Sequence, residues 1–108
     1  MTNIAQSGWQ EATISDGDTS VDIDLGALFT RIVVLVPSLT GAYVTVSVSR
    51  DNSTFFTLEQ VSNGDELDSV VNDSRAQIVD IGGMQYIRLT ANAAQSGSDA
   101  NCLVKGVR

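Results

Sequence analysis

The chain lacks several residue types on which enzyme and metal chemistry depend. Its 108 residues include no histidine and a single cysteine, Cys102. Without histidine there is no Ser-His-Asp triad and no histidine metal site, and one cysteine cannot form an intrachain disulfide. Cys102 stands beside Leu103 and Val104 in an apolar run. We therefore interpret its thiol as a small buried hydrophobic group rather than a nucleophile.

Cationic residues and long apolar runs are scarce as well. Six Lys and Arg oppose 13 Asp and Glu, which gives a net charge of −7. Nucleic acids and anionic membranes attract clustered Lys and Arg, so neither is an expected partner. No apolar run approaches the roughly 20 residues that span a bilayer, and residues 1–8 lack the charged and apolar parts of a signal peptide. We expect synthesis in the cytoplasm and no membrane insertion.

Three motifs could suggest a ligand, and none has the spacing that its chemistry requires. The acidic segment 16–24 has neither the sixth-position glycine nor the twelfth-position glutamate of an EF-hand. The segment 80–84 is too short for a phosphate-binding loop and is interpreted as a bend. Trp9, Tyr43 and Tyr86 favour packing over a sugar-stacking platform. We expect no catalytic residue, no metal, no cofactor and no enzymatic activity.

Alternating Val, Ser and Thr residues dominate what is present. Between Tyr43 and Ser49, the residues Val44, Val46 and Val48 point to one side of an extended chain, and a polar turn at 50–54 follows. Similar segments recur at spacings near 8–12 residues, which predicts an all-β, eight-stranded antiparallel β-sandwich (jelly roll). The expected strands are residues 9–15, 20–26, 31–36, 42–50, 55–61, 75–81, 86–92 and 101–107.

Two segments depart from simple alternation. Residues 31–36 are almost continuously apolar, which predicts a central strand that is covered on both faces. Residues 62–74 form a polar excursion, in which 65–73 is the one helix candidate. The length fits one domain. Residues 1–19 are assigned to an N-terminal arm with the first strand, and residues 20–108 to the sandwich body.

Several motifs resemble those of discoidin-like, or galactose-binding-like, jelly rolls. Ile23-Asp-Leu-Gly26 before an apolar strand is similar to their IDLG strand, and Tyr86-Ile-Arg-Leu89 is similar to their R-Y-I-R-L strand. The hairpin of residues 44–56 is similar to their V-x-V-S-x-D-G-x-x-F/W hairpin. The resemblance covers residues 20–108 and implies the jelly-roll fold. The long aromatic or basic loops of the ligand-binding members are missing here.

A second resemblance is to small accessory virion proteins of tailed bacteriophages. The segments 24–37 and 102–108 carry it. It implies a capsid decoration (cement) protein that is located in the virion, contacts the major capsid protein or another virion protein, and forms a symmetric oligomer such as a trimer. The alternative is a carbohydrate-binding or adaptor module of a tail or baseplate.

The candidate partner-binding residues lie in the N-terminal arm and in the apolar loop of residues 27–29. They are Ile4, Trp9, Leu28 and Phe29. Exposed apolar residues mark interaction sites. Leu28 and Phe29 have an equally weighted alternative, in which they cap the sandwich core.

Overall fold

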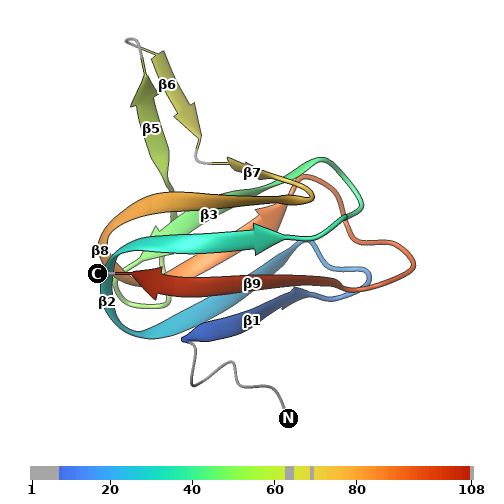
Figure 1. Cartoon of the computed structure of the whole chain (residues 1–108), viewed down its shortest axis with the longest axis horizontal. Helices are drawn as coiled ribbons and strands as arrows, with labels where there is room; N and C mark the ends of the chain where they lie inside the picture. The colour runs from blue at the N-terminus through green and yellow to red at the C-terminus, as the bar shows by residue number, and fades with distance from the viewer. Residues whose placement is uncertain (1–7, 63–64, 69, 108) are drawn as a thin grey trace.

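The computed structural model describes residues 8–62, 65–68 and 70–107, without the side chains of residues 59–62 and 65–68. All regular secondary structure in this part of the chain is β-strand. The all-β sandwich is confirmed, with seven strands in the main sheet rather than eight and two more in a separate hairpin (Figure 1). The strands are β1 (Trp9–Ile14), β2 (Ser20–Val36), β3 (Tyr43–Ser49), β4 (Phe56–Thr57), β5 (Glu59–Ser62), β6 (Asp65–Asp68), β7 (Val70–Asn72), β8 (Arg75–Ala91) and β9 (Ala100–Val107).

Two 17-residue strands, β2 and β8, connect the layers of the sandwich. The expected strands 20–26 and 31–36 are the two halves of β2, and 75–81 and 86–92 are the two halves of β8. Both strands turn at the left-hand side of Figure 1 and continue in the other layer. Layer A contains β1, β9, the second half of β2 and the first half of β8. Layer B contains the first half of β2, the second half of β8, β3, β4 and β7.

The same local motif makes both corners. In β2, the Gly26 amide donates a 2.8 Å hydrogen bond to Asp24 Oδ1, and in β8 the Gly82 amide donates one of 3.1 Å to Asp80 Oδ1. The two glycines have φ values of 82° and 65°, which side chains with a Cβ rarely adopt. The bend expected at 80–84 is thus confirmed, although the strand continues through it.

The core lies between the layers and is filled by the inward-facing residue of each alternating pair. In layer B, Val46 lies beside Leu89 and Val48 beside Ile87, because β3 pairs with β8. Each fully buried aliphatic side chain contributes about 1.5–3 kcal/mol relative to exposure. The largest fully buried side chains are Ile14, Ile32, Ile81, Ile87, Leu89, Val34, Val44, Val46, Val71, Val79, Val104 and Cys102.

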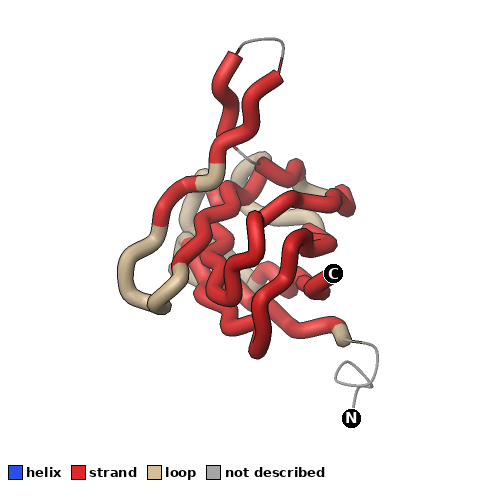
Figure 2. Tube along the Cα trace, turned by 90° about the vertical axis from the view of Figure 1, so that its left-hand side faces the viewer, coloured by secondary structure: helices blue, strands red, loops and turns tan. Residues whose placement is uncertain are grey.

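The polar excursion contains strands rather than a helix. β5 and β6 pair with each other as an antiparallel hairpin, and β7 pairs with β3. The helix candidate at 65–73 is therefore wrong. Figure 2 shows the β5–β6 hairpin projecting away from the two layers. The described part of the chain contains no helix with the length and hydropathy that a membrane crossing requires.

Gln95 holds together the loops at the end of the sandwich opposite the corners. Its side chain is 3% exposed, and its amide group exchanges hydrogen bonds of 3.0 Å with the backbone N–H and C=O of Thr40. Its own backbone bonds to Gly17 and Asp18. A buried amide must be paired to avoid a desolvation cost. Three loops are therefore fixed to one another at this end.

Candidate partner-binding surfaces

Metal-ligating and thiol side chains are considered first. No three His, Cys, Asp or Glu side chains within this part of the chain lie close enough to hold a metal ion. Cys102 is buried, and burial raises the pKa of its thiol to about 11. The thiolate that a nucleophile requires is thus disfavoured at neutral pH.

The outer side of layer A carries two rows of cross-strand neighbours, which we call the apolar face. Its strands alternate between inward-facing core residues and outward-facing residues, and six of the eight outward residues in these two rows are apolar. Figure 1 shows this layer nearest the viewer, with no described strand in front of it. The first row is Trp9, Lys105, Val33 and Ile78, and the second row is Glu11, Leu103, Leu35 and Ala76.

The burial of the apolar face differs from the sequence expectation. Val33 and Leu35 are half-buried and Ile78 is 61% exposed, although the segment 31–36 is central in the sheet. The expectation of two covered faces is wrong for the described residues, because the second layer covers only the inner side. Lys105 stands in the middle of the first row, and its ammonium lies 5.9 Å from the centre of the Trp9 ring. This cation–π contact holds the positive charge of Lys105 near Trp9, on the edge strand β1 of the face.

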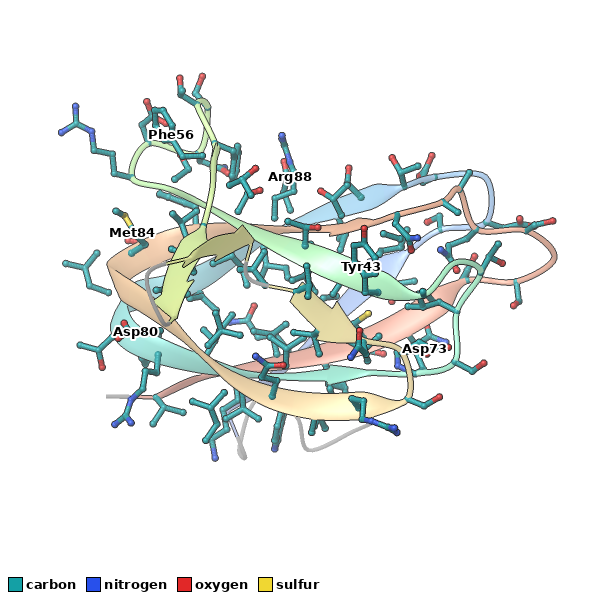
Figure 3. The ribbon with its side chains drawn as sticks, turned by 90° about the horizontal axis from the view of Figure 1, so that it is seen from above. Tyr43, Phe56, Asp73, Asp80, Met84 and Arg88 are labelled. Carbon is teal, nitrogen blue, oxygen red and sulfur yellow. The ribbon has the colours of Figure 1, made fainter. Side chains whose placement is uncertain are left out.

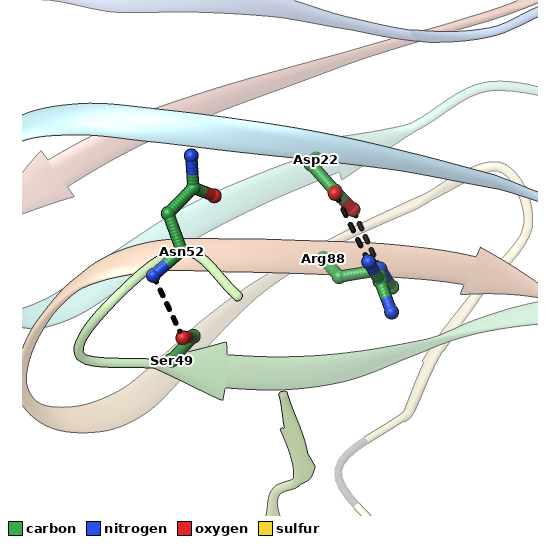
Figure 4. A network of polar contacts seen from close by, with 4 residues as sticks. All are labelled: Asp22, Ser49, Asn52 and Arg88. Carbon is green, nitrogen blue, oxygen red and sulfur yellow. Dashed lines mark hydrogen bonds and ion pairs between the residues drawn. The ribbon is translucent and has the colours of Figure 1, made fainter. Parts of the chain in front are cut away.

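The outer side of layer B, which we call the polar face, has a charged centre. Arg88 donates hydrogen bonds from Nε and one terminal nitrogen to the two oxygens of Asp22, at 2.6 and 3.0 Å (Figure 4). These bonds lower the pKa of Asp22 and raise that of Arg88. The Phe55 ring lies beneath the guanidinium, with its centre 4.1 Å from Cζ. Both partners of the ion pair are exposed by more than a third, so it contributes at most about 1 kcal/mol.

A tight loop holds Phe55 at this position. The buried Ser49 hydroxyl accepts hydrogen bonds from the Asp51 and Asn52 amides, the latter drawn in Figure 4. Asp51 Oδ1 in turn accepts bonds from the Ser53 and Thr54 amides and from the Ser49 hydroxyl. These donors, the Thr54 amide foremost, lower the pKa of Asp51 to about 2. Asx and Ser side chains therefore satisfy the turn backbone, as the sequence predicted for residues 50–54.

The corner end of the sandwich exposes two large apolar side chains. Leu28 is 65% and Phe56 is 66% exposed. Figure 3 shows Phe56 and Met84 toward the end of the molecule opposite Asp73. The neighbouring Phe29 is half-buried and packs against the core. A Cβ at Gly106 would lie 2.5 Å from the Phe29 ring, so the ring occupies the space that this glycine leaves.

The sequence-predicted contact residues thus fall on two surfaces. Trp9 lies on the apolar face, whereas Leu28 and Phe29 lie at the corner end. Ile4 lies outside the described residues. Sequence reasoning missed Ile78 and Phe56. Alternation gave no signal for Phe56, because this residue lies opposite the inward-facing Val48 and is nevertheless exposed on the edge strand β4.

Comparison with known proteins supports the fold. No family model matches the chain, and no curated protein matches its sequence. Among solved structures, the SPBc2 prophage-derived protein YomS aligns over 93% of this chain and 95% of its own, with a TM-score of 0.57 and 13% identity. A CBM32 module of a family 31 glycoside hydrolase from Clostridium perfringens aligns over 92% of this chain and 77% of its own, with a TM-score of 0.52 and 14% identity.

A third solved structure matches at the limit of useful similarity. The family 89 glycoside hydrolase from Clostridium perfringens has a TM-score of 0.50 and 21% identity, and the alignment covers 91% of this chain but only 11% of the hydrolase. All three identities are low, so these likenesses establish a common fold. The discoidin-like sandwich expected from the motifs agrees with them.

Proposed function

We propose that the chain is a non-enzymatic structural protein of a bacteriophage particle. In this proposal it is a capsid decoration (cement) protein that binds the major capsid protein or another virion protein and stabilises the head. The likeness to the prophage-derived protein supports it, because the alignment leaves only a few per cent of either chain unmatched. The absence of histidine and the buried Cys102 are compatible with a role in binding rather than catalysis.

The observation that carries the proposal is the pair of exposed apolar side chains at the corner end. Leu28 and Phe56 are both about two-thirds exposed, although neither is needed to fill the core. Burying such a side chain against a partner contributes about 1.5–3 kcal/mol. A cement protein uses this kind of contact to bridge neighbouring subunits across a seam. The Asp24 and Asp80 carboxylates brace the two bends at this end, since they accept hydrogen bonds from the Gly26 and Gly82 amides.

The test is to locate the protein on particles produced by a host that carries the gene. Immunogold electron microscopy of purified particles should label the heads. The double variant Leu28→Asp/Phe56→Asp should lose at least about 90% of the label, because two charges would be buried at the contact. Ser38→Asp, an exposed position at the Gln95 end, is the matched control and should label normally. Unlabelled particles, or full labelling by the double variant, would overturn the proposal.

A carbohydrate-binding or adaptor module of a tail or baseplate is the second candidate. The fold likeness to the CBM32 module favours it. Calorimetric titration with a panel of mono- and oligosaccharides separates the two functions. Binding tighter than about 1 mM, together with label on tails, would replace the cement proposal; this affinity corresponds to about −4 kcal/mol.

A further inference from the structure

We propose that the apolar face binds the same face of a second copy of this chain, which makes a weak symmetric dimer. The inference does not depend on the proposed virion role, since it rests on the outer side of layer A alone. The apolar face carries its apolar side chains on the side of the sheet that faces away from the core. The largest apolar patch on the surface of a protein often has a function in binding.

The distribution of charge selects the partner. Four charged residues stand on the outer side of layer A: Glu11 and Lys105 within the apolar face, and Arg31 and Asp80 in the row beside it. Their charges cancel. The chain as a whole carries −7, and all of that excess therefore lies elsewhere. Contact between two copies through this face therefore adds no net like-charge repulsion at the interface itself. A basic partner, in contrast, would be drawn to the acidic surfaces instead of the apolar face.

The pattern of the face also suits pairing with itself. A two-fold interface brings the same patch together from both sides, so apolar rows meet apolar rows. Lys105 and Glu11 lie on adjacent strands, one in each row, and the face offers both signs of charge to an identical partner. Lys105 keeps its ammonium toward Trp9, which leaves Val33, Leu35 and Leu103 as the contiguous apolar centre.

The size of the face sets the expected strength. Four strands at about 4.8 Å spacing and a five-residue run at about 3.3 Å per residue give roughly 300 Å² in projection. A standard interface buries about 800 Å² per partner. Side chains that project from the sheet add accessible area to this projected value, but not enough to reach the area of a standard interface. The dimer should therefore be weak, with a dissociation constant on the order of 100 μM.

Sedimentation equilibrium of the full chain, from about 10 μM to about 1 mM, provides the test. The mass should rise from one copy toward two. Raising the salt from about 0.02 to about 1 M should tighten the dimer at least threefold, because screening removes the repulsion between acidic surfaces. A mass that stays at one copy up to 1 mM at both salt concentrations would overturn the inference. A mass that rises toward three copies would overturn the two-fold geometry.

Two matched variants assign the surface. Leu35→Glu places one negative charge at the centre of the apolar face, and Thr45→Glu places the same charge on β3 of the polar face. The first should weaken the dimer at least tenfold, and the second less than twofold. Equal effects would place the contact elsewhere. Chemical-shift changes on dilution of the wild-type protein are an independent test. The largest changes should occur at Val33, Leu35 and Leu103. If the largest changes occurred at Asp22 and Arg88 instead, they would contradict the proposal.

Discussion

The two outer faces of the sandwich share the strands β2 and β8 and differ sharply in chemistry. β2 contributes Val33 and Leu35 to the apolar face of layer A, and on the other side of its bend it contributes Asp22 to the polar face of layer B. β8 does the same with Ile78 and Arg88. Because one strand serves both faces, the difference arises from which residues alternate outward in each half. In layer A these outward residues include Val33, Leu35 and Ile78, whereas in layer B they include the ion pair of Asp22 and Arg88.

The largest contrast is expected between the reaction rates of a thiol at position 102 and a thiol at position 103, which are neighbours on β9. Cys102 points into the core with its pKa raised to about 11, whereas position 103 points out from the apolar face. In the variant Leu103→Cys, the new thiol should react with a disulfide reagent at pH 8 about 100-fold faster than Cys102, because an ordinary thiol has a pKa near 8.5. Absorbance kinetics measure both rates, with Cys102 in unfolded protein as the reference. Similar rates in the folded protein would show that the alternation on β9 has been assigned wrongly.

The next contrast is in stability, between adjacent residues of β2. Ile32 is fully buried, while Val33 is half-buried on the apolar face. Ile32→Ala should lower the free energy of unfolding by about 2–5 kcal/mol, since it leaves a cavity in the core. Val33→Ala should cost less than about 1 kcal/mol. Urea denaturation gives both values, and it must be done at low protein concentration so that dimerisation adds nothing. A larger cost for Val33→Ala would mean that this face is covered in the monomer.

The smallest effect concerns the loop that closes over the polar face. The pKa of Asp51 is about 2 in the folded chain against an ordinary value of 3.8. A lowered pKa means that the ionised carboxylate stabilises the fold above about pH 4 and loses this contribution as the pH falls through about 2. The difference in unfolding free energy between wild type and Asp51→Asn should therefore shrink over that window. Carbon-detected NMR of the carboxyl group checks the cause, and a titration midpoint near 3.8 would refute it.

Much of the fold could be predicted because it depends on local pattern. Alternation around Val44, Val46 and Val48 marks a strand with one buried face, and Pro37 follows directly after the last residue of β2. The turn at 50–54 was also predictable, since its Asp, Asn and Ser residues satisfy the backbone within the loop itself. These features require no knowledge of what lies across the sheet.

The remaining features depend on long-range pairing. The motif Asp24-Leu-Gly26 stands at the end of an expected strand, and only the pairing of β2 with β8 on both sides of the bends shows that each strand continues through its bend. Likewise, the apolar run 31–36 is compatible with a strand covered on both faces or on one. Which applies depends on whether another layer lies outside it. Leu28 and Phe29 are adjacent in sequence, yet only the space above Gly106 determines that Phe29 turns inward.

The pairing of β1 with β9 has a consequence for how the chain folds. Trp9 lies opposite Lys105, and Ser20 lies opposite Thr90, so strands far apart in sequence must meet before either layer is complete. Only short hairpins such as β5–β6 form from neighbouring residues. Folds dominated by such distant contacts form slowly, in milliseconds to seconds, because loop closure must precede the stabilising contacts. On the ribosome, β1 and the first half of β2 would remain without their partners until β8 and β9 have been synthesised.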